Sequence, residues 1–222
     1  MSGAGRAVGV AVLLANALFA HDIITTNLTY TQDVSRILAR RCIQCHSASS
    51  SIPLTNYTEV RPWAVDIKEQ VLSRAMPPWG AVKGFGELSP DRGLTQEEIL
   101  ILAAWAVGGA PQGDPALLPR TQATPMAKMP VLKDVLAVTS RITLSKPLRV
   151  AGIRPMATKI VPSARITARF PDGRIEPLVW LYRFDPQTKL TFQFRRPLTL
   201  PSGTIVQSST PLAFALEAAP PS

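Results

Sequence analysis

The sequence is poor in cysteine, histidine and charged residues, and each shortage excludes a class of protein. Only two cysteines and two histidines occur among 222 residues. Two cysteines are too few for a disulfide scaffold. No uninterrupted apolar run reaches the ~20 residues that a membrane span needs, which excludes a polytopic membrane protein. Charged residues make up 18% and hydrophobic residues 46% of the chain, a composition that argues against disorder.

The chain is basic, with a formal net charge of +9 that suggests nucleic-acid binding until the charge is located. Segment 119–222 carries 15 basic and 5 acidic residues, whereas segment 21–118 carries 8 and 10. In the alternating run 165–170, Arg165 and Arg169 fall on one face of an expected strand. Such a face either docks an acidic partner or is simply solvated, and nucleic acid is not an expected partner.

The N-terminus has the pattern of a secretory signal. Arg6 precedes the apolar stretch 7–15, and Ala15-Asn16-Ala17 is a small-x-small cleavage site. We expect a signal peptide over 1–20 and a mature chain that begins near Leu18 or His21. The expected location is periplasmic or secreted, with membrane contact at most peripheral or through an uncleaved N-terminus.

The two halves of the chain differ in composition and predicted structure. Sixteen of the 21 prolines follow residue 110. Apolar periodicity predicts helices over 32–40, 60–74 and 95–107, the first capped by Thr31 and the last by the capping box of Thr95 and Glu98. Alternation and turn signals predict strands over 135–144, 165–170, 175–184, 190–195 and 204–208. The expected fold class is multidomain α + β: an N-terminal all-α domain (21–115), a linker (116–130) and a C-terminal antiparallel β-sandwich (131–217).

Cys42-Ile43-Gln44-Cys45-His46 is a C-x-x-C-H motif and uses both cysteines of the chain. Two thiols at this spacing can add to the two vinyl groups of haem, and the adjacent histidine then ligates the iron. A zinc site would need further nitrogen or sulfur ligands, and only His21 remains. A redox dithiol needs a βαβ setting, and a plain disulfide leaves His46 unexplained. The motif therefore predicts one covalently bound haem.

Met76 is the expected second axial ligand of the iron. It lies in Ala75-Met76-Pro77-Pro78-Trp79, where two prolines stiffen the backbone, although a methionine that fills a core is the plainer alternative. Rival candidates are Met126, Met129 and Met156. We expect Trp63, Trp79 and Trp105 to pack against the macrocycle or the helix crossing. Arg74 and Lys83 are candidates for pairing with haem propionates, or plain surface charges.

Residues 27–115 resemble a class I cytochrome c domain through segments 42–46, 57–63, 76–79 and 94–114. The combination is similar to the cytochrome c domains fused to copper type II ascorbate-dependent monooxygenase-like domains in secreted bacterial proteins. This resemblance implies Cys42 and Cys45 as haem attachments and His46 and Met76 as axial ligands.

Residues 131–217 are similar to the C-terminal β-sandwich of those monooxygenases, through segments 152–155, 170–173, 197–201 and 203–204. That family places a His-Met-His triplet after the proline that matches Pro155. This chain has Met156-Ala157-Thr158 there, and no histidine follows His46. Since copper of that type needs imidazole nitrogens, we expect no copper.

Three functions follow from these features. The first is electron transfer by a monohaem c-type cytochrome, whose partner is another redox protein, acidic if the basic face docks it. The alternatives are a haem-bearing subunit of an oxidoreductase or monooxygenase system and a haem-based sensor or binding module. The chain itself is not expected to be an enzyme: no histidine is left for a catalytic triad, and no glycine-rich phosphate loop occurs.

Overall fold

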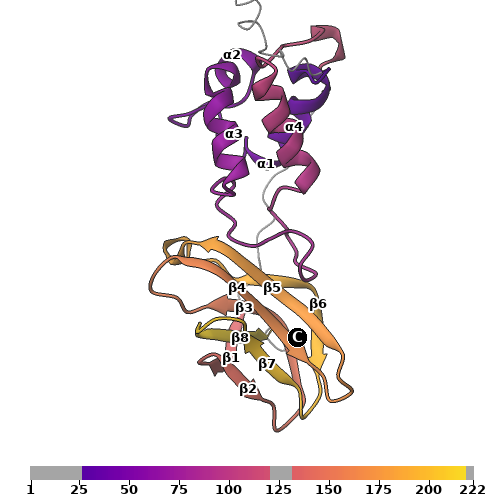
Figure 1. The fold of residues 1–222 in the computed structure, drawn as a ribbon, viewed down its shortest axis with the longest axis vertical. Helices are drawn as coiled ribbons and strands as arrows, with labels where there is room; N and C mark the ends of the chain where they lie inside the picture. Colours follow the sequence, from indigo (N-terminus) through magenta and orange to yellow (C-terminus); the bar gives the residue numbers. More distant parts are fainter. Residues whose placement is uncertain (1–26, 121–131, 219–222) are drawn as a thin grey trace, which may run out of the picture.

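The computed structural model describes residues 27–120 and 132–218, with helices at one end of an elongated molecule and strands at the other (Figure 1). The helical segments are the π-helical turn Tyr30–Val34, α1 (Ser35–Arg41), α2 (Tyr57–Val60), the 3-10 turn Arg61–Trp63, α3 (Ala64–Leu72) and α4 (Gln96–Val107), with further 3-10 turns at Pro115–Leu117 and Pro186–Thr188. The strands are β1 (Lys133–Val138), β2 (Arg141–Thr143), β3 (Leu148–Pro155), β4 (Val161–Arg169), β5 (Ile175–Phe184), β6 (Phe192–Leu200), β7 (Ile205–Ser208) and β8 (Phe214–Ala218). Among the described residues, no helix combines the length and the apolar character that crossing a bilayer requires.

The predicted helices are present in altered form. The capping box that begins α4 is confirmed: the Thr95 side chain accepts from the backbone of Glu98, and the Glu98 carboxylate accepts from the backbone of Thr95. The first helix begins earlier than expected, because Thr29 rather than Thr31 caps it. The expected helix over 60–74 is interrupted, because the 3-10 turn Arg61–Trp63 separates α2 from α3.

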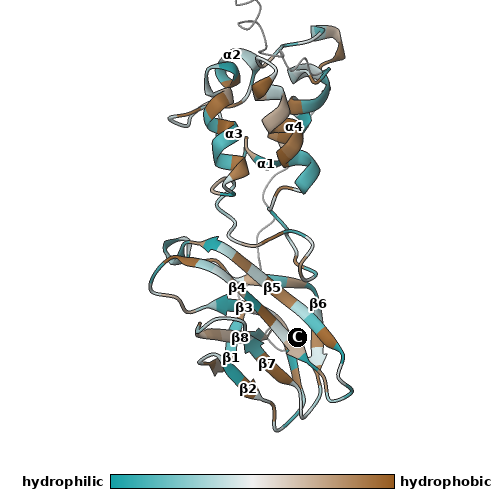
Figure 2. Cartoon of the chain, viewed as in Figure 1, coloured by the Kyte–Doolittle hydropathy of each residue, from teal (hydrophilic) through white to brown (hydrophobic). Residues whose placement is uncertain are grey.

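The strands form two antiparallel sheets of four strands. Their orders are β1-β8-β3-β6 and β2-β7-β4-β5, so β6 and β5 are edge strands of different sheets. The tight turn after β4 is as expected: Phe170 donates to the carbonyl of Arg174 at 2.8 Å, and Gly173 supplies the positive φ of +87°. Hydrophobic and hydrophilic residues are interspersed along the strands, and hydrophobic residues are prominent on α4 (Figure 2). One apolar core lies among the strands, and a second lies among the helices.

The predicted fold class is wrong, because the first half of the chain is not an all-α domain. The described chain is mainly β, and its α-helices are short, between 4 and 12 residues long. Residues 73–95 contain no helix. Trp79 and Leu88 from this stretch belong to the apolar core of the strands, and Ala81 and Leu88 form isolated β-bridges with Leu181 and Phe194. The helical segments therefore enclose a stretch of chain that packs as part of the β structure.

Of the eight strands in the described residues, β3 and β8 were missed by the sequence patterns. In β3 the consecutive residues 150–153 are all buried, and in β8 residues 214–217 are all buried, so neither strand shows the alternation that reveals a half-buried strand. The predicted signal peptide, His21 and most of the predicted linker, with Met126 and Met129, lie outside the described residues.

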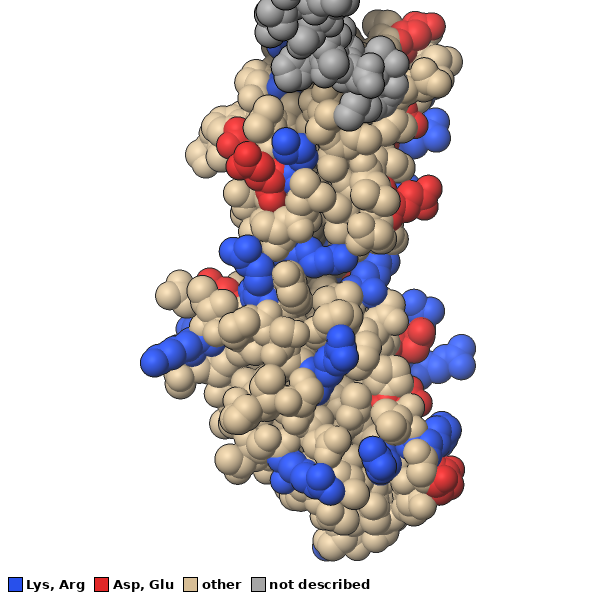
Figure 3. All heavy atoms as spheres, viewed as in Figure 1, with Lys and Arg blue, Asp and Glu red and all other residues tan. Residues whose placement is uncertain are grey.

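Lys and Arg side chains gather on the visible face where the helices meet the sheets, while the helical end carries both signs (Figure 3). The predicted alternation of β4 is confirmed: Arg165 and Arg169 are exposed, and Ile166 and Ala168 are buried. The Arg165 guanidinium lies over the Trp180 ring, 4.2 Å from its centroid. Part of the basic face is therefore occupied by contacts within the sheet.

Candidate haem-attachment site

The C-x-x-C-H motif forms a single turn of backbone at the end of α1. Cys42 caps the helix and donates its N–H to the carbonyl of Leu38 at 2.9 Å. The carbonyl of Cys42 then accepts from Cys45 at 3.0 Å and from His46 at 2.9 Å. One further hydrogen-bonded turn thus follows the helix and carries Cys42, Cys45 and His46.

The His46 ring is oriented by a backbone carbonyl. Its Nδ1 lies 2.8 Å from the carbonyl oxygen of Ile52, and since a carbonyl only accepts, Nδ1 carries the proton. In the neutral ring the lone pair is then on Nε2, the tautomer that a metal-ligating histidine needs. A second hydrogen bond closes the loop 47–54: the Leu54 N–H donates to the carbonyl of His46 at 3.0 Å. The loop 47–54 thus holds the ring before any ligand binds.

The two thiols are not joined in a disulfide and differ in environment. Cys42 is half-buried against the helical core, and Cys45 is exposed. Burial, together with the smaller effect of the nearby Glu98 carboxylate, raises the pKa of Cys42 to about 12. Cys42 is thus held as a neutral thiol in the folded chain.

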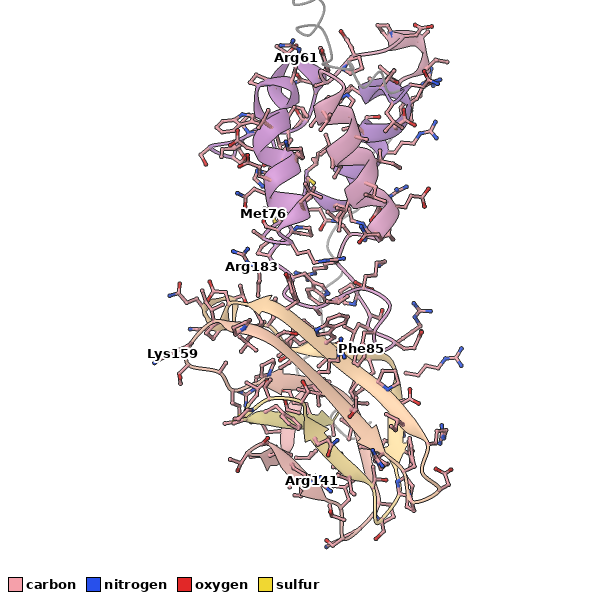
Figure 4. All side chains as sticks on the ribbon, in the orientation of Figure 1. Arg61, Met76, Phe85, Arg141, Lys159 and Arg183 are labelled. Carbon is pink, nitrogen blue, oxygen red and sulfur yellow. The ribbon has the colours of Figure 1, made fainter. Side chains whose placement is uncertain are left out.

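Met76 lies on the loop that follows α3, at the junction of helices and sheets (Figure 4). Its side chain is 41% exposed, so it is not a core methionine. The loop begins with Arg74 in the left-handed region, at φ +55°. Met76 lines a cavity together with Val71 and Ile99 from the helices and Tyr182 from β5. The thioether is therefore placed at an opening that both parts of the molecule line.

The three tryptophans of the first half have different surroundings. Trp105 is fully buried in the helical core and donates from Nε1 to the carbonyl of Pro111 at 3.0 Å. Trp63 is 38% exposed. Trp79 is 3% exposed and lies in the core of the strands rather than among the helices. Its Nε1–H is buried without an acceptor among the described residues, although the ring lines the same cavity as Met76.

The charged candidates for propionate pairing already have partners within the chain. Arg74 donates to the Gln96 side-chain oxygen at 3.1 Å. Lys83 pairs with Asp91 at 3.0 Å. The rival ligand Met156 directly follows β3 on the strand half and donates its N–H to Ala213, so it is not part of the helical site.

The residues present fit a covalently bound haem better than a bare metal ion. Within residues 27–120 and 132–218, no group of three or more His, Cys, Asp and Glu side chains is arranged to hold a metal ion. A haem iron needs only axial ligands from the chain, because the porphyrin supplies the other four. The free thiols and the carbonyl-bound His46 ring are the kinds of group that the vinyl groups and the iron of a haem would need. The residues that line the cavity beside Met76 and Trp79 do not include Cys42, Cys45 or His46.

Sequence reasoning identified the residues of the turn but missed what positions Met76. Neither the attachment of segment 79–89 to the strands nor the contribution of Tyr182 was predicted. A weak signal existed in Gly80, since a glycine often marks a site where another part of the chain approaches the backbone closely. Compared with known family models, curated proteins and solved structures, the chain has no match.

Proposed function

We propose that this chain is a monohaem c-type cytochrome that transfers electrons, with Cys42 and Cys45 bound to haem and His46 and Met76 as axial ligands. The observation that carries the proposal is the turn 42–46 with the His46 Nδ1 tied to the carbonyl of Ile52. This geometry presents two thiols and an unprotonated Nε2 from one turn of backbone. In its bound state, haem supplies a one-electron couple between ferric and ferrous iron.

The residues of the chain have distinct roles in this proposal. Cys42 and Cys45 would hold the haem through thioethers: each thiol would add across one vinyl group, with sulfur bonded to one carbon and the thiol hydrogen on the other, so that no oxidant would be needed. His46 donates the Nε2 lone pair, and its hydrogen bond to Ile52 keeps the ring from rotating. Met76 supplies a thioether, which favours the ferrous state and raises the reduction potential.

Electron transfer is favoured over the alternatives because two side chains are available as axial ligands. Iron with both axial positions occupied has no open site for oxygen or another small molecule, which suits transfer between proteins. The proposed location is outside the cytoplasm, and the proposed partner is a redox protein. Lys and Arg side chains gather on the visible face at the junction of helices and sheets, and Met76 lies at the same junction, which favours an acidic partner (Figures 3 and 4).

The test is production of the chain in a host that attaches haem to C-x-x-C-H motifs. We expect haem that stays with the polypeptide on a denaturing gel. The double variant Cys42→Ser/Cys45→Ser should lose this signal, while Met76→Ala should keep it. Absence of covalent haem in the wild type would refute the proposal.

A second measurement separates electron transfer from sensing. The ferrous wild type should bind carbon monoxide poorly, and Met76→Ala should bind it readily because an axial position is open. Ready binding by the wild type would instead favour the sensor function.

A further inference from the structure

A strap formed by residues 79–89 joins the loop that carries Met76 to both sheets. At its first end, Tyr182 of β5 donates to the carbonyl of Gly80 at 3.0 Å, and Val82 donates to the carbonyl of Trp180 at 2.8 Å. At its second end, Ser89 donates to the carbonyl of Gln193 in β6 at 2.9 Å. Since β5 and β6 are edge strands of different sheets, the strap pairs with both open edges on one side of the strand half.

The strap lies too close to β5 to shift without breaking contacts. A Cβ at Gly80 would lie 2.8 Å from the Phe184 ring and 3.2 Å from the Phe184 Cα. A Cβ at Gly86 would lie 2.1 Å from the carbonyl oxygen of Leu178. Only glycine fits at these two positions, where φ is also positive, so the strap is seated against the backbone of the sheet.

Trp79 fixes the start of the strap. The indole is buried in the core of the strands and meets the Phe192 ring edge-on. Trp79 is three residues after Met76, a stretch that spans at most about 11 Å. The Met76 backbone therefore remains within that radius of a ring held in the sheet core.

The other side of Met76 is held by α3. The N–H groups of Ala75 and Met76 both donate to the carbonyl of Gln70, at 2.9 and 3.2 Å. The loop is thus anchored on a helix before Met76 and on the sheets after it. Tyr182, whose backbone binds the strap, also lines the cavity beside Met76.

We infer that the strand half is the positioning device for the axial methionine: the strap bound to β5 and β6 holds the Met76 thioether where it ligates the iron. This inference rests on the proposed function and assigns a role to the strand half, in which the sequence contains no histidine. Anchoring at both ends removes conformations that a free loop would explore, and so lowers the entropy lost on ligation. Loosening the strap therefore weakens ligation by Met76 without touching the haem attachments.

The decisive variant is Gly80→Ala in the haem-bearing protein. Its Cβ collides with Phe184, which displaces the strap from β5. We expect covalent haem to be retained on a denaturing gel. We also expect loss of the weak long-wavelength absorbance of ferric iron bound to a thioether, a lower reduction potential, and at least about tenfold tighter binding of carbon monoxide to ferrous iron.

Gly84→Ala is the matched control. Gly84 lies in the same strap with φ +84°, but a Cβ there meets nothing within 4 Å. It carries the same kind of backbone strain without the collision, so the absorbance, the potential and the carbon monoxide affinity should stay near the wild-type values, within about twofold for the affinity.

Hydrogen exchange at the Val82 and Tyr182 amides reports whether the strap has left β5, and Trp79→Ala provides a second way to release it. Loss of the thioether signature in step with faster exchange supports the inference. The inference is overturned if the Val82 and Tyr182 amides exchange faster in both variants while the long-wavelength absorbance of thioether-bound iron is kept. It is also overturned if both variants keep the wild-type protection of these amides.

The wild type separates this inference from the function on which it rests. If it carries haem but lacks the thioether signature, the inference fails while haem attachment stands. If it carries no covalent haem, the proposed function itself fails.

Discussion

The Trp79 indole meets the Phe192 ring edge-on, with 5.0 Å between the ring centroids and 74° between the planes. Phe192 in turn meets Phe184 at 5.9 Å. The three rings join the segment after Met76 to strands β5 and β6, which belong to different sheets. The Arg92 guanidinium lies over the Trp79 ring, 5.6 Å from the ring centroid. Trp79, which comes from the first half of the sequence, is therefore part of the apolar core of the strands.

Replacing Trp79 with alanine should destabilise the protein strongly. The buried indole leaves a cavity in the sheet core, and large-to-small changes of aromatic residues in cores cost about 3–5 kcal/mol. Urea unfolding followed by circular dichroism measures the loss. The control is Trp63→Ala, where the ring is partly exposed and the expected loss is below about 1 kcal/mol. Equal losses for the two variants would contradict the placement of Trp79 in the core.

Among the acidic residues around the helices, Glu98 should contribute most to the free energy of unfolding. Its carboxylate accepts from the Thr95 N–H at 2.8 Å and from Arg41 Nε at 3.2 Å, with Arg40 at 3.5 Å. It is 7% exposed, and removing it leaves the partly buried donors Thr95 N–H and Arg41 Nε without this acceptor. Glu98→Ala should cost about 1–3 kcal/mol in the free energy of unfolding.

The neighbouring Glu97 is the control for this prediction. Glu97 lies in the same first turn of α4 and is exposed, so Glu97→Ala should change stability by no more than about 0.5 kcal/mol. Chemical denaturation of both variants checks the difference, and matching stabilities would show that the buried contacts of Glu98 contribute nothing.

The sequence predicted best the features that depend on neighbouring residues. The cap of α4 follows from Thr95 and Glu98 alone, and the turn before β5 follows from Asp172-Gly173. Haem attachment at 42–46 stays a prediction, and it too depends only on five consecutive residues. Local rules of this kind need no knowledge of the fold.

The all-α first half was predicted wrongly because the attachment of segment 79–89 is not local. Trp79 and Phe192 are more than one hundred residues apart, and their contact depends on which edges of the two sheets are open. Apolar and polar residues do not alternate regularly along the strap, since its backbone pairs with β5 at Ala81 and with β6 at Leu88, a few residues later. Periodicity within a short window cannot show such a contact.

The two cysteines of the haem-free protein should react at different rates. Cys45 is exposed, whereas Cys42 is half-buried, and burial raises its pKa to about 12. Because the thiolate is the reactive form, alkylation of Cys42 at pH 8 should be at least about tenfold slower than that of Cys45. Peptide mapping after a short pulse of iodoacetamide measures both rates. In denaturant the difference should vanish, and similar rates in the folded protein would contradict the structure.

Glu217 in β8 should make stability depend on pH in an unusual direction. Its side chain is buried between Arg154 and Asp134, and Arg154 Nε donates to Glu217 Oε1 at 3.2 Å. Burial raises the pKa of Glu217 above the ordinary value of 4.5, Asp134 raises it further, and Arg154 opposes both. The folded state thus holds the proton more tightly than the unfolded chain. The resulting stabilisation is complete below about pH 4.5 and is lost as the pH rises through the folded pKa.

Glu217→Gln tests this linkage because glutamine stays neutral at every pH. Relative to the wild type, the variant should gain stability progressively as the pH rises from 4.5 to 8, since only the wild type must then ionise a buried carboxyl. Urea unfolding at a series of pH values measures the difference. The control is Glu176→Gln, where the carboxylate pairs loosely with Arg174 at 3.8 Å beside the β4–β5 turn, and the difference from the wild type should stay flat. If the curves of Glu217→Gln and the wild type run parallel over this range, Glu217 does not bind its proton more tightly in the folded state.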